Sequence, residues 1–370
     1  MRLASARFER LVLLNRPRKF SKTVRQQLKQ TLIEILNMKI IKLLLLVSIL
    51  ASCTTENTRN IDSVIESTFE MKTISKGNNH PKIDISQDSL FIFLTALHFD
   101  IPINEITSKL NWDKEETDKN IKSLIENNLL VKNENKYTPN LGIFTIERGN
   151  RLIEKTSTIA NEIADSLIGK ISTVKKMHHE MSVSRRYEFQ ELSFFYLSNI
   201  ILDMAQINNV EKEFLKKERP LRNGVRYYSA ILEKDSSEIT EPFRLYGNQG
   251  LWRSDSTYIG VYGNTRTEAN IGWNSYENKN VHYFSKSDLD FIVNKMPEIF
   301  LPTLLNILER NKPYLLSVYK TLEFENETSF EEFFIWWYHF IYSETTDILI
   351  RKGQISKPES GLFYYELKMK

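Results

Sequence analysis

The chain has 370 residues, a length typical of two or three domains. Hydrophobic residues make up 41% of it and charged residues 26%, which excludes a wholly disordered, collagen-like or polytopic membrane chain. The single cysteine excludes a disulfide scaffold and a zinc site built from four thiolates.

The formal net charge of +3 is distributed unevenly along the chain. Residues 1–37 contain nine lysines and arginines against two glutamates, so this segment carries +7. Lys39 and Lys42 add two positive charges, which leaves −6 for residues 53–370. The body of the protein is therefore acidic, and the basic isoelectric point near 8.6 comes from the N-terminal segment.

Residues 38–52 have the organisation of a secretory signal. Lys39 and Lys42 precede an apolar run of about ten residues, which is too short to cross a bilayer but fits the central region of a signal peptide. The run ends in Leu50-Ala51-Ser52-Cys53. This tetrapeptide resembles the lipobox of bacterial lipoproteins, in which small residues precede the cysteine at which the signal is cleaved.

The resemblance implies cleavage between Ser52 and Cys53, with Cys53 carrying a diacylglycerol and fatty acids such as palmitate. It places the protein on the cell envelope, anchored to the membrane by lipid. In a cell with two membranes we expect the outer one, with the body periplasmic or surface-exposed. The polar residues 53–82 are expected to form a flexible tether. The alternative is a buried amphipathic helix with an incidental cysteine.

Residues 1–37 are too long for the basic part of a signal peptide. Either translation starts at Met38 and this segment is a mis-annotated upstream extension, or it forms a weak basic amphipathic helix. We favour the first account and exclude the segment from the prediction of the fold.

The clearest pattern lies in residues 83–150. Apolar spacing predicts helices over residues 88–98, 103–110 and 113–127, followed by short strands at 129–131 and 136–138. The third helix begins with Asp113 and, three residues on, Glu116, as in a capping box.

Three helices followed by a two-stranded ribbon resemble a winged helix-turn-helix domain. Thr145 and Gly149, before a long helix, resemble the segment that follows the wing in MarR-type regulators. The resemblance covers less than a quarter of the chain and implies a fold only.

Residues 151–223 are predicted to form a helical connector. Within it, residues 188–207 are apolar nearly all round, interrupted by Asn199 and Asp203. We interpret them as a buried core helix and not as a membrane span.

Residues 224–370 are predicted to form an α+β domain rich in aromatic residues. Glycines alternate with tyrosines and tryptophans up to residue 284, which indicates strands and turns. A helix from residue 287, kinked or split by Pro297 and Pro302, and a helix from about residue 328 follow. A final hairpin is expected from residues 348–351 and 362–365. The class predicted for the whole chain is α+β, predominantly helical.

The aromatic stretch supplies the candidate ligand-binding residues. An aromatic face with amide neighbours suits a sugar or a peptidoglycan fragment, and the candidates are Trp252, Trp273, Tyr246 and Tyr262. The alternative, which we favour, is that these residues form the inner face of a small sheet. A basic cluster at residues 216–226 is either an anion contact or, as we favour, a charged loop. His339, among aromatic residues, is expected to be a packed histidine with one hydrogen bond.

The sequence contains no phosphate loop, nucleophile elbow or zinc-binding helix motif. No catalytic residue, metal or cofactor is assigned, and the adjacent His178 and His179 point too far apart on a helix to share one metal. The preferred function is a non-enzymatic interaction or ligand-binding lipoprotein, with an envelope protein or a glycan as partner and the winged helix as a scaffold.

The alternative function is a cytoplasmic DNA-binding transcriptional regulator. The third predicted helix argues against it, because residues 113–127 carry a net charge of −2 and contain no arginine. Affinity for DNA comes largely from lysines and arginines that neutralise phosphates. No specific nucleic acid is therefore expected as a partner.

Overall fold

The first described elements are a helix and a strand in the segment predicted to be a tether. The computed structural model describes residues 59–134, 136–234, 245–254, 257–264 and 280–368, all within one compact unit, Arg59–Lys370. The signal peptide, the lipobox with Ser52 and Cys53, the extension 1–37 and Trp273 lie outside these residues.

The tether prediction is wrong for residues 61–74. Residues 59–82 contain helix α3 (Ile61–Glu66) and strand β1 (Thr68–Ile74). Strand β1 pairs antiparallel with β7 (Tyr228–Lys234), from Thr68 opposite Lys234 to Ile74 opposite Tyr228. The polar composition of this segment concealed a strand whose partner lies about 160 residues further along the chain.

The next elements follow the predicted order closely. Helices α4 (Leu90–His98), α5 (Ile103–Leu110) and α6 (Lys114–Glu126) precede the antiparallel hairpin β2 (Leu130–Asn133) and β3 (Lys136–Pro139). The side chain of Asp113 caps α6 by accepting a hydrogen bond from the backbone N–H of Glu116, at 2.8 Å. Asn128, just after α6, has a φ of 51°, in the left-handed region that a residue past a helix end adopts.

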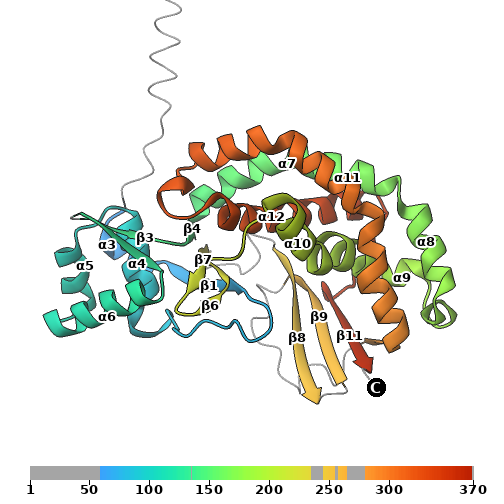
Figure 1. Ribbon diagram of the computed structural model, residues 1–370, viewed down its shortest axis with the longest axis horizontal. Coiled ribbons are helices and arrows are strands. Elements are labelled where there is room, and N and C mark those ends of the chain that lie inside the picture. Colours follow the sequence, from blue (N-terminus) through green and yellow to red (C-terminus); the bar gives the residue numbers. More distant parts are fainter. Residues whose placement is uncertain (1–58, 135, 235–244, 255–256, 265–279, 369–370) are drawn as a thin grey trace, which may run out of the picture. The chain divides into compact units, whose positions relative to one another are not determined.

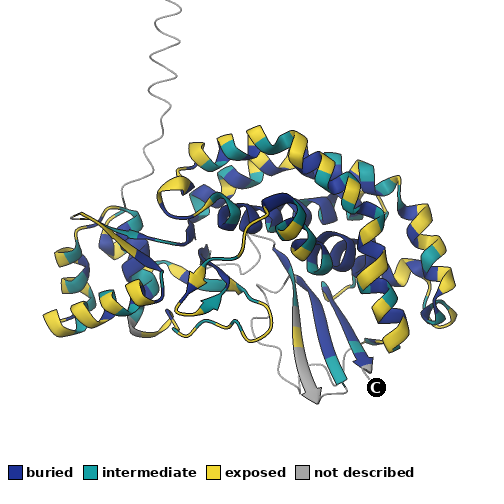
Figure 2. Ribbon diagram, in the orientation of Figure 1, coloured by how far each residue is buried: buried dark blue, intermediate teal, exposed yellow. Residues whose placement is uncertain are grey.

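A helical layer follows the short strand β4 (Gly142–Phe144), as Figure 1 shows. It contains α7 (Ile146–Ile168), α8 (Ile171–Glu180), α9 (Phe189–Ser193), a π-helix η3 (Phe194–Met204), α10 (Ala205–Val210), a second π-helical segment η4 (Glu211–Leu215), α11 (Lys286–Thr321) and α12 (Phe330–Arg351). Residues 194–203 of η3 are all buried, which confirms the predicted core helix. Figure 2 shows the outer helix α11 presenting exposed residues, whereas α12 is almost wholly buried.

The longest helix, α11, contains Pro297, Pro302 and Pro313. It is one continuous helix in its hydrogen-bonding pattern, and Figure 1 shows that it changes direction along its length, as proline in a helix favours. Among the described residues α11 is the one helix long and apolar enough to span a membrane, by length and composition only. It buries Ile292, Phe300 and eight or more other residues within this fold, as amphipathic core helices do.

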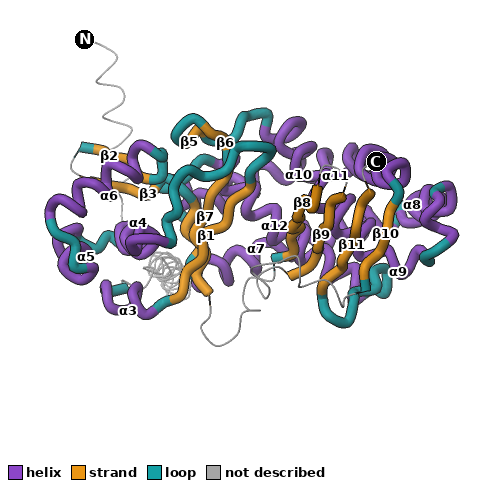
Figure 3. Tube along the Cα trace, turned by 90° about the horizontal axis from the view of Figure 1, so that it is seen from below, coloured by secondary structure: helices purple, strands orange, loops and turns teal. Residues whose placement is uncertain are grey.

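Two sheets lie beneath the helical layer (Figure 3). The first has the order β1-β7-β4, with β4 parallel to β7. The second has the order β10-β11-β9-β8 and consists of β8 (Tyr246–Ser254), β9 (Thr257–Asn264), β10 (Val281–Phe284) and β11 (Leu362–Lys368). Short strands β5 (Leu221–Arg222) and β6 (Val225–Arg226) form a separate hairpin. Because β7 joins β1 and β4, the predicted tether, N-terminal module and C-terminal domain share one sheet.

The predicted final hairpin is wrong. Residues 348–351 are the last turn of α12, while β11 pairs antiparallel with β9 and parallel with β10. The run Ile348-Leu349-Ile350 has the composition of a strand, but it belongs to α12, and Ile348 and Leu349 are buried in the core. Gly353, with a φ of 67°, then turns the chain away from the helix.

The alternation of glycines with aromatic residues has a packing explanation in β9. A Cβ atom on Gly260 would lie 2.2 Å from the ring of Tyr365, its partner on β11. The tyrosine ring therefore lies across the glycine backbone. The predicted class, α+β and predominantly helical, is confirmed.

Candidate functional site

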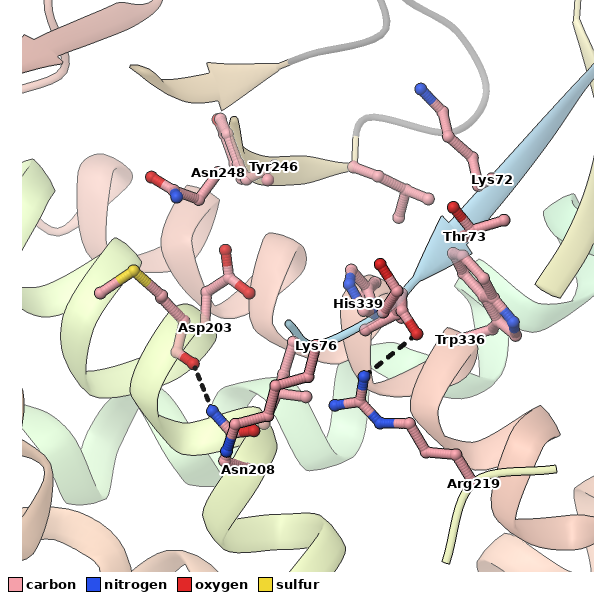
Figure 4. Close-up of a pocket in the computed structure, with 16 residues that line it drawn as sticks. Lys72, Thr73, Lys76, Asp203, Asn208, Arg219, Tyr246, Asn248, Trp336 and His339 are labelled. Atoms are coloured by element: carbon pink, nitrogen blue, oxygen red, sulfur yellow. Dashed lines mark hydrogen bonds between the residues drawn. The ribbon is translucent and has the colours of Figure 1, made fainter. Parts of the chain in front are cut away.

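A cavity of about 450 Å³ opens where β1, the junction of η3 and α10, the start of β8 and helix α12 meet. This volume is within the range of small-molecule sites. Figure 4 shows the side chains that line it, which include Lys72, Thr73, Lys76, Asp203, Asn208, Arg219, Tyr246, Asn248, Trp336 and His339.

Asp203 is the most unusual of these residues. It lies on the last turn of η3 and is only 4% exposed. Its Oδ2 atom is buried and makes no hydrogen bond with any described residue. Burial raises the pKa of the Asp203 carboxyl to about 8, and the neighbouring Tyr342 hydroxyl opposes this shift. A long π-helix is rare in proteins, and π-helical turns are frequent at functional sites.

Two groups on α12 complete this wall of the cavity. The Nδ1–H of His339 donates to the backbone carbonyl of Ile335, at 2.7 Å, which leaves Nε2 as an acceptor. Burial lowers the pKa of His339 to about 4, so the ring is neutral near pH 7. The indole Nε1 of Trp336 is a buried donor to which the described part of the chain offers no acceptor.

The cations of the cavity are mostly neutralised by nearby carboxylates. Arg219 donates to both carboxylate oxygens of Glu211, each at 3.0 Å, and to the backbone carbonyl of Ile74, at 3.1 Å. Lys72 lies 3.4 Å from Glu70, whose carboxylate also pairs with Lys234, at 2.6 Å. Lys76 lines the cavity and is exposed.

Hydrogen bonds fix the β8 side of the cavity. The Tyr342 hydroxyl donates to the Tyr246 carbonyl, at 2.6 Å, and the Tyr246 hydroxyl donates to Asp347, at 2.8 Å. Tyr365 donates to the Oδ1 of Asn248, at 2.6 Å. These contacts tie the start of β8 to α12 and β11, while Ser75, Lys76, Arg219 and Leu245 bring loop residues to the cavity wall.

Of the four predicted ligand-binding residues, Tyr246 is the one that the description places in the wall of this cavity. Tyr246 lines the cavity and is buried, whereas Tyr262 is fully buried and its hydroxyl bonds to Ser198, at 2.5 Å. Tyr262 is thus a core residue, as the sheet alternative predicted. Trp252 lies on β8 with its side chain outside the description, and Trp273 lies outside the described residues.

The basic cluster at residues 216–226, interpreted as a charged loop, contains the β5–β6 hairpin, and most of its basic residues are paired. Arg219 lies in the cavity wall, and Arg222 is buried against Glu332, at 2.9 Å. Lys217 pairs with Glu331 and Arg226 with Glu218.

Sequence reasoning missed the cavity but contained one signal for it. Asp203 interrupts an apolar helix in the sequence, and a buried carboxyl in such a helix requires an explanation. His339 is confirmed as a packed histidine with one hydrogen bond, but its position at a cavity was not foreseen. No cluster of three metal-ligating side chains occurs within the described ranges.

Comparison with known proteins assigns the chain to no family. No family model matches the chain, and neither a curated protein nor a solved structure matches it.

Proposed function

We propose that this protein is a lipid-anchored envelope protein whose body binds a small polar molecule in the cavity between β1, η3, β8 and α12. The observation that carries the proposal is Asp203, a buried carboxyl with an unpartnered oxygen among the described residues, on the wall of a cavity of about 450 Å³. Buried polar atoms normally have partners, and a site built to hold a ligand is a common reason for an exception.

The proposed role is binding without catalysis. Of the basic groups that line the cavity, Arg219 and Lys72 lie beside carboxylates, and His339 is held by Ile335. Such fixed groups suit recognition of a ligand. The location on the envelope rests on Lys39 to Cys53, whose pattern resembles a lipoprotein signal.

We further propose that residues 83–150 form a winged-helix module that acts as a scaffold. The order α4, α5, α6 and the hairpin β2–β3 supports this proposal. The surface charge disfavours the regulator alternative, since α6 begins with Glu115 and Glu116 in its first turn and ends without a basic residue. Those two carboxylates would face the phosphates of a DNA groove.

Filling the cavity should abolish ligand binding. Asn208 is exposed and lines the cavity from α10, so Asn208→Trp places an indole in it with little expected cost to folding. A ligand at a hundred times its Kd stabilises the folded state by about 2.7 kcal/mol, which a thermal melt detects. We expect sugars, amino sugars, amino alcohols or peptidoglycan fragments to include compounds that stabilise the wild type but not Asn208→Trp.

The matched control is Lys212→Trp, which puts the same side chain at an exposed position that does not line the cavity. It should respond to ligands as the wild type does. If none of these compounds stabilises the wild type, or if Asn208→Trp responds equally, the cavity is not the binding site.

Cys53→Ala should release the protein from the membrane. Each buried acyl methylene contributes about 0.8 kcal/mol, so two or three chains hold a lipoprotein on the membrane almost permanently. After fractionation we expect the wild type in the membrane pellet, with an acylated N-terminal Cys53 by mass spectrometry, and an uncleaved precursor for the variant. A free thiol at Cys53, or a wild type found in the cytosol or with the nucleoid, would instead favour the regulator.

A further inference from the structure

The unpartnered groups of the cavity define what kind of ligand it accepts. On the inner wall, the ionised form of Asp203 and the Nε2 atom of His339 are hydrogen-bond acceptors, and the Oδ2 atom of Asp203 accepts no hydrogen bond from the described residues. The indole N–H of Trp336 is buried in the wall and is not open to the cavity. A ligand that satisfies this wall has several N–H or O–H donors at one end.

The charge of this wall selects among ligands with several donors. Arg219 is paired with Glu211, and Lys72 shares the carboxylate of Glu70 with Lys234. Within the described residues, no lysine or arginine forms an ion pair with Asp203. A carboxylate taken from water needs a cation beside it to be stable in the ionised form. An ammonium group supplies both the positive charge and three N–H donors.

We infer that the cavity binds a small organic amine, whose ammonium group pairs with Asp203. The carbon chain of the ligand lies against the apolar part of the lining, which includes Met204, Ile207 and Leu245. An anionic ligand cannot form this ion pair, and its charge would oppose the ionisation of Asp203. This inference rests on the proposed function of the cavity and specifies its ligand class.

Binding of an amine should release a proton. Burial raises the pKa of Asp203 to about 8, so near pH 7 its carboxyl is mostly protonated before binding. Pairing with a cation favours the ionised form, which expels that proton into the solvent. The affinity for the amine should therefore rise about tenfold per pH unit from pH 6 towards pH 8 and then level off, because the amine itself keeps its charge up to about pH 10.

The other groups around Asp203 keep one charge state across this range. Burial raises the pKa of the tyrosines that interact with the carboxyl, which are Tyr262, Tyr338, Tyr342 and Tyr365. His339 titrates near pH 4 and the Tyr246 hydroxyl is bonded to Asp347. Lysines and arginines such as Lys72, Lys76 and Arg219 carry their charge throughout. The pH dependence of amine affinity between pH 6 and pH 8 therefore reports the ionisation of Asp203.

The test uses three probes matched in length, namely aminohexanol, hexanediol and hydroxyhexanoate, which end in an ammonium, a hydroxyl and a carboxylate. Isothermal titration of residues 53–370 should show aminohexanol binding at least tenfold more tightly than either of the others at pH 7.5. Titrations in two buffers of different ionisation enthalpy should show between half and one proton released per amine at pH 7.

Asp203→Asn keeps the shape of the side chain and removes its charge. This variant should bind aminohexanol at least tenfold more weakly than the wild type and should release no proton. The control Asp290→Asn removes an exposed carboxylate of α11 and should change neither quantity. If Asp203→Asn fails to fold, the proton release and the pH profile of the wild type still decide.

Equal affinity for hexanediol and aminohexanol, or amine binding without proton release, overturns the inference. A neutral or anionic compound that stabilises the wild type but not Asn208→Trp would leave the proposed binding function standing and refute the amine. Failure of every compound in both experiments would instead refute the binding function itself.

Discussion

Replacing Arg222 by alanine should destabilise the protein by about 3–5 kcal/mol, a large part of the 5–15 kcal/mol that typically separates folded from unfolded states. Arg222 is fully buried. It donates to the carbonyls of Tyr227 and Asn140, at 2.7 and 2.9 Å, and to the carboxylate of Glu332, at 2.9 Å. One side chain thus connects the β5–β6 hairpin, the loop before β4 and helix α12.

The loss is large because the alanine variant leaves Glu332 buried without its cation. That carboxylate also accepts from the backbone N–H of Ser229, at 2.7 Å, and from the hydroxyl of Thr328, at 2.9 Å, so it cannot move to solvent without breaking β7 and α12 contacts. An unpaired buried charge costs far more than a lost surface contact. Urea unfolding monitored by circular dichroism measures the effect.

The matched control is Arg351→Ala, which removes an arginine from an exposed pair with Glu344 and should cost less than about 1 kcal/mol. A double variant, Arg222→Met with Glu332→Gln, removes both charges and should be more stable than Arg222→Ala alone. If the double variant is the less stable of the two, the destabilisation comes from lost packing and not from the unpaired carboxylate.

Acid should weaken the fold through Glu327. Its carboxylate is buried, bonds to His98 and accepts from Arg148, at 2.9 Å. Burial alone would raise the pKa of Glu327, but Arg148 and His98 outweigh it and hold the pKa at about 2. Because this folded-state pKa lies below the ordinary value of 4.5, the stabilisation is fully present above about pH 4.5 and is lost as the pH falls towards 2.

The size of this loss is about 3 kcal/mol, from roughly 1.4 kcal/mol for each unit of pKa difference. Glu327→Gln lacks the titrating group, so its free energy of unfolding should fall less steeply between pH 5 and pH 2.5 than that of the wild type. Urea titrations at a series of pH values measure both slopes. Parallel slopes for the two proteins would show that Glu327 contributes no acid sensitivity.

The sequence alone could not locate the cluster of His98, Arg148 and Glu327, because its members lie on separate elements. His98 ends α4, Arg148 lies in the first turn of α7, and Glu327 lies between α11 and α12. Arg148 also donates to the carbonyls of Ile143 and Leu322, at 2.9 and 2.7 Å. These residues are separated by up to 229 positions, and their individual patterns resemble ordinary helix-end charges.

The sequence by itself determined the local structure of α4, α5 and α6, the capping residue Asp113, the buried character of η3 and the predominantly helical α+β class. Local patterns determine these features because a helix stripe, a cap and an apolar helix are set by residues within a few positions of one another. Only the tertiary structure decided that β1 pairs with β7, that residues 348–351 extend α12, and that Asp203, Trp336 and His339 share one cavity. Strand partners and cavity walls come from segments far apart in the chain, and the free energy of burying them together outweighs the local preferences on which sequence reasoning depends.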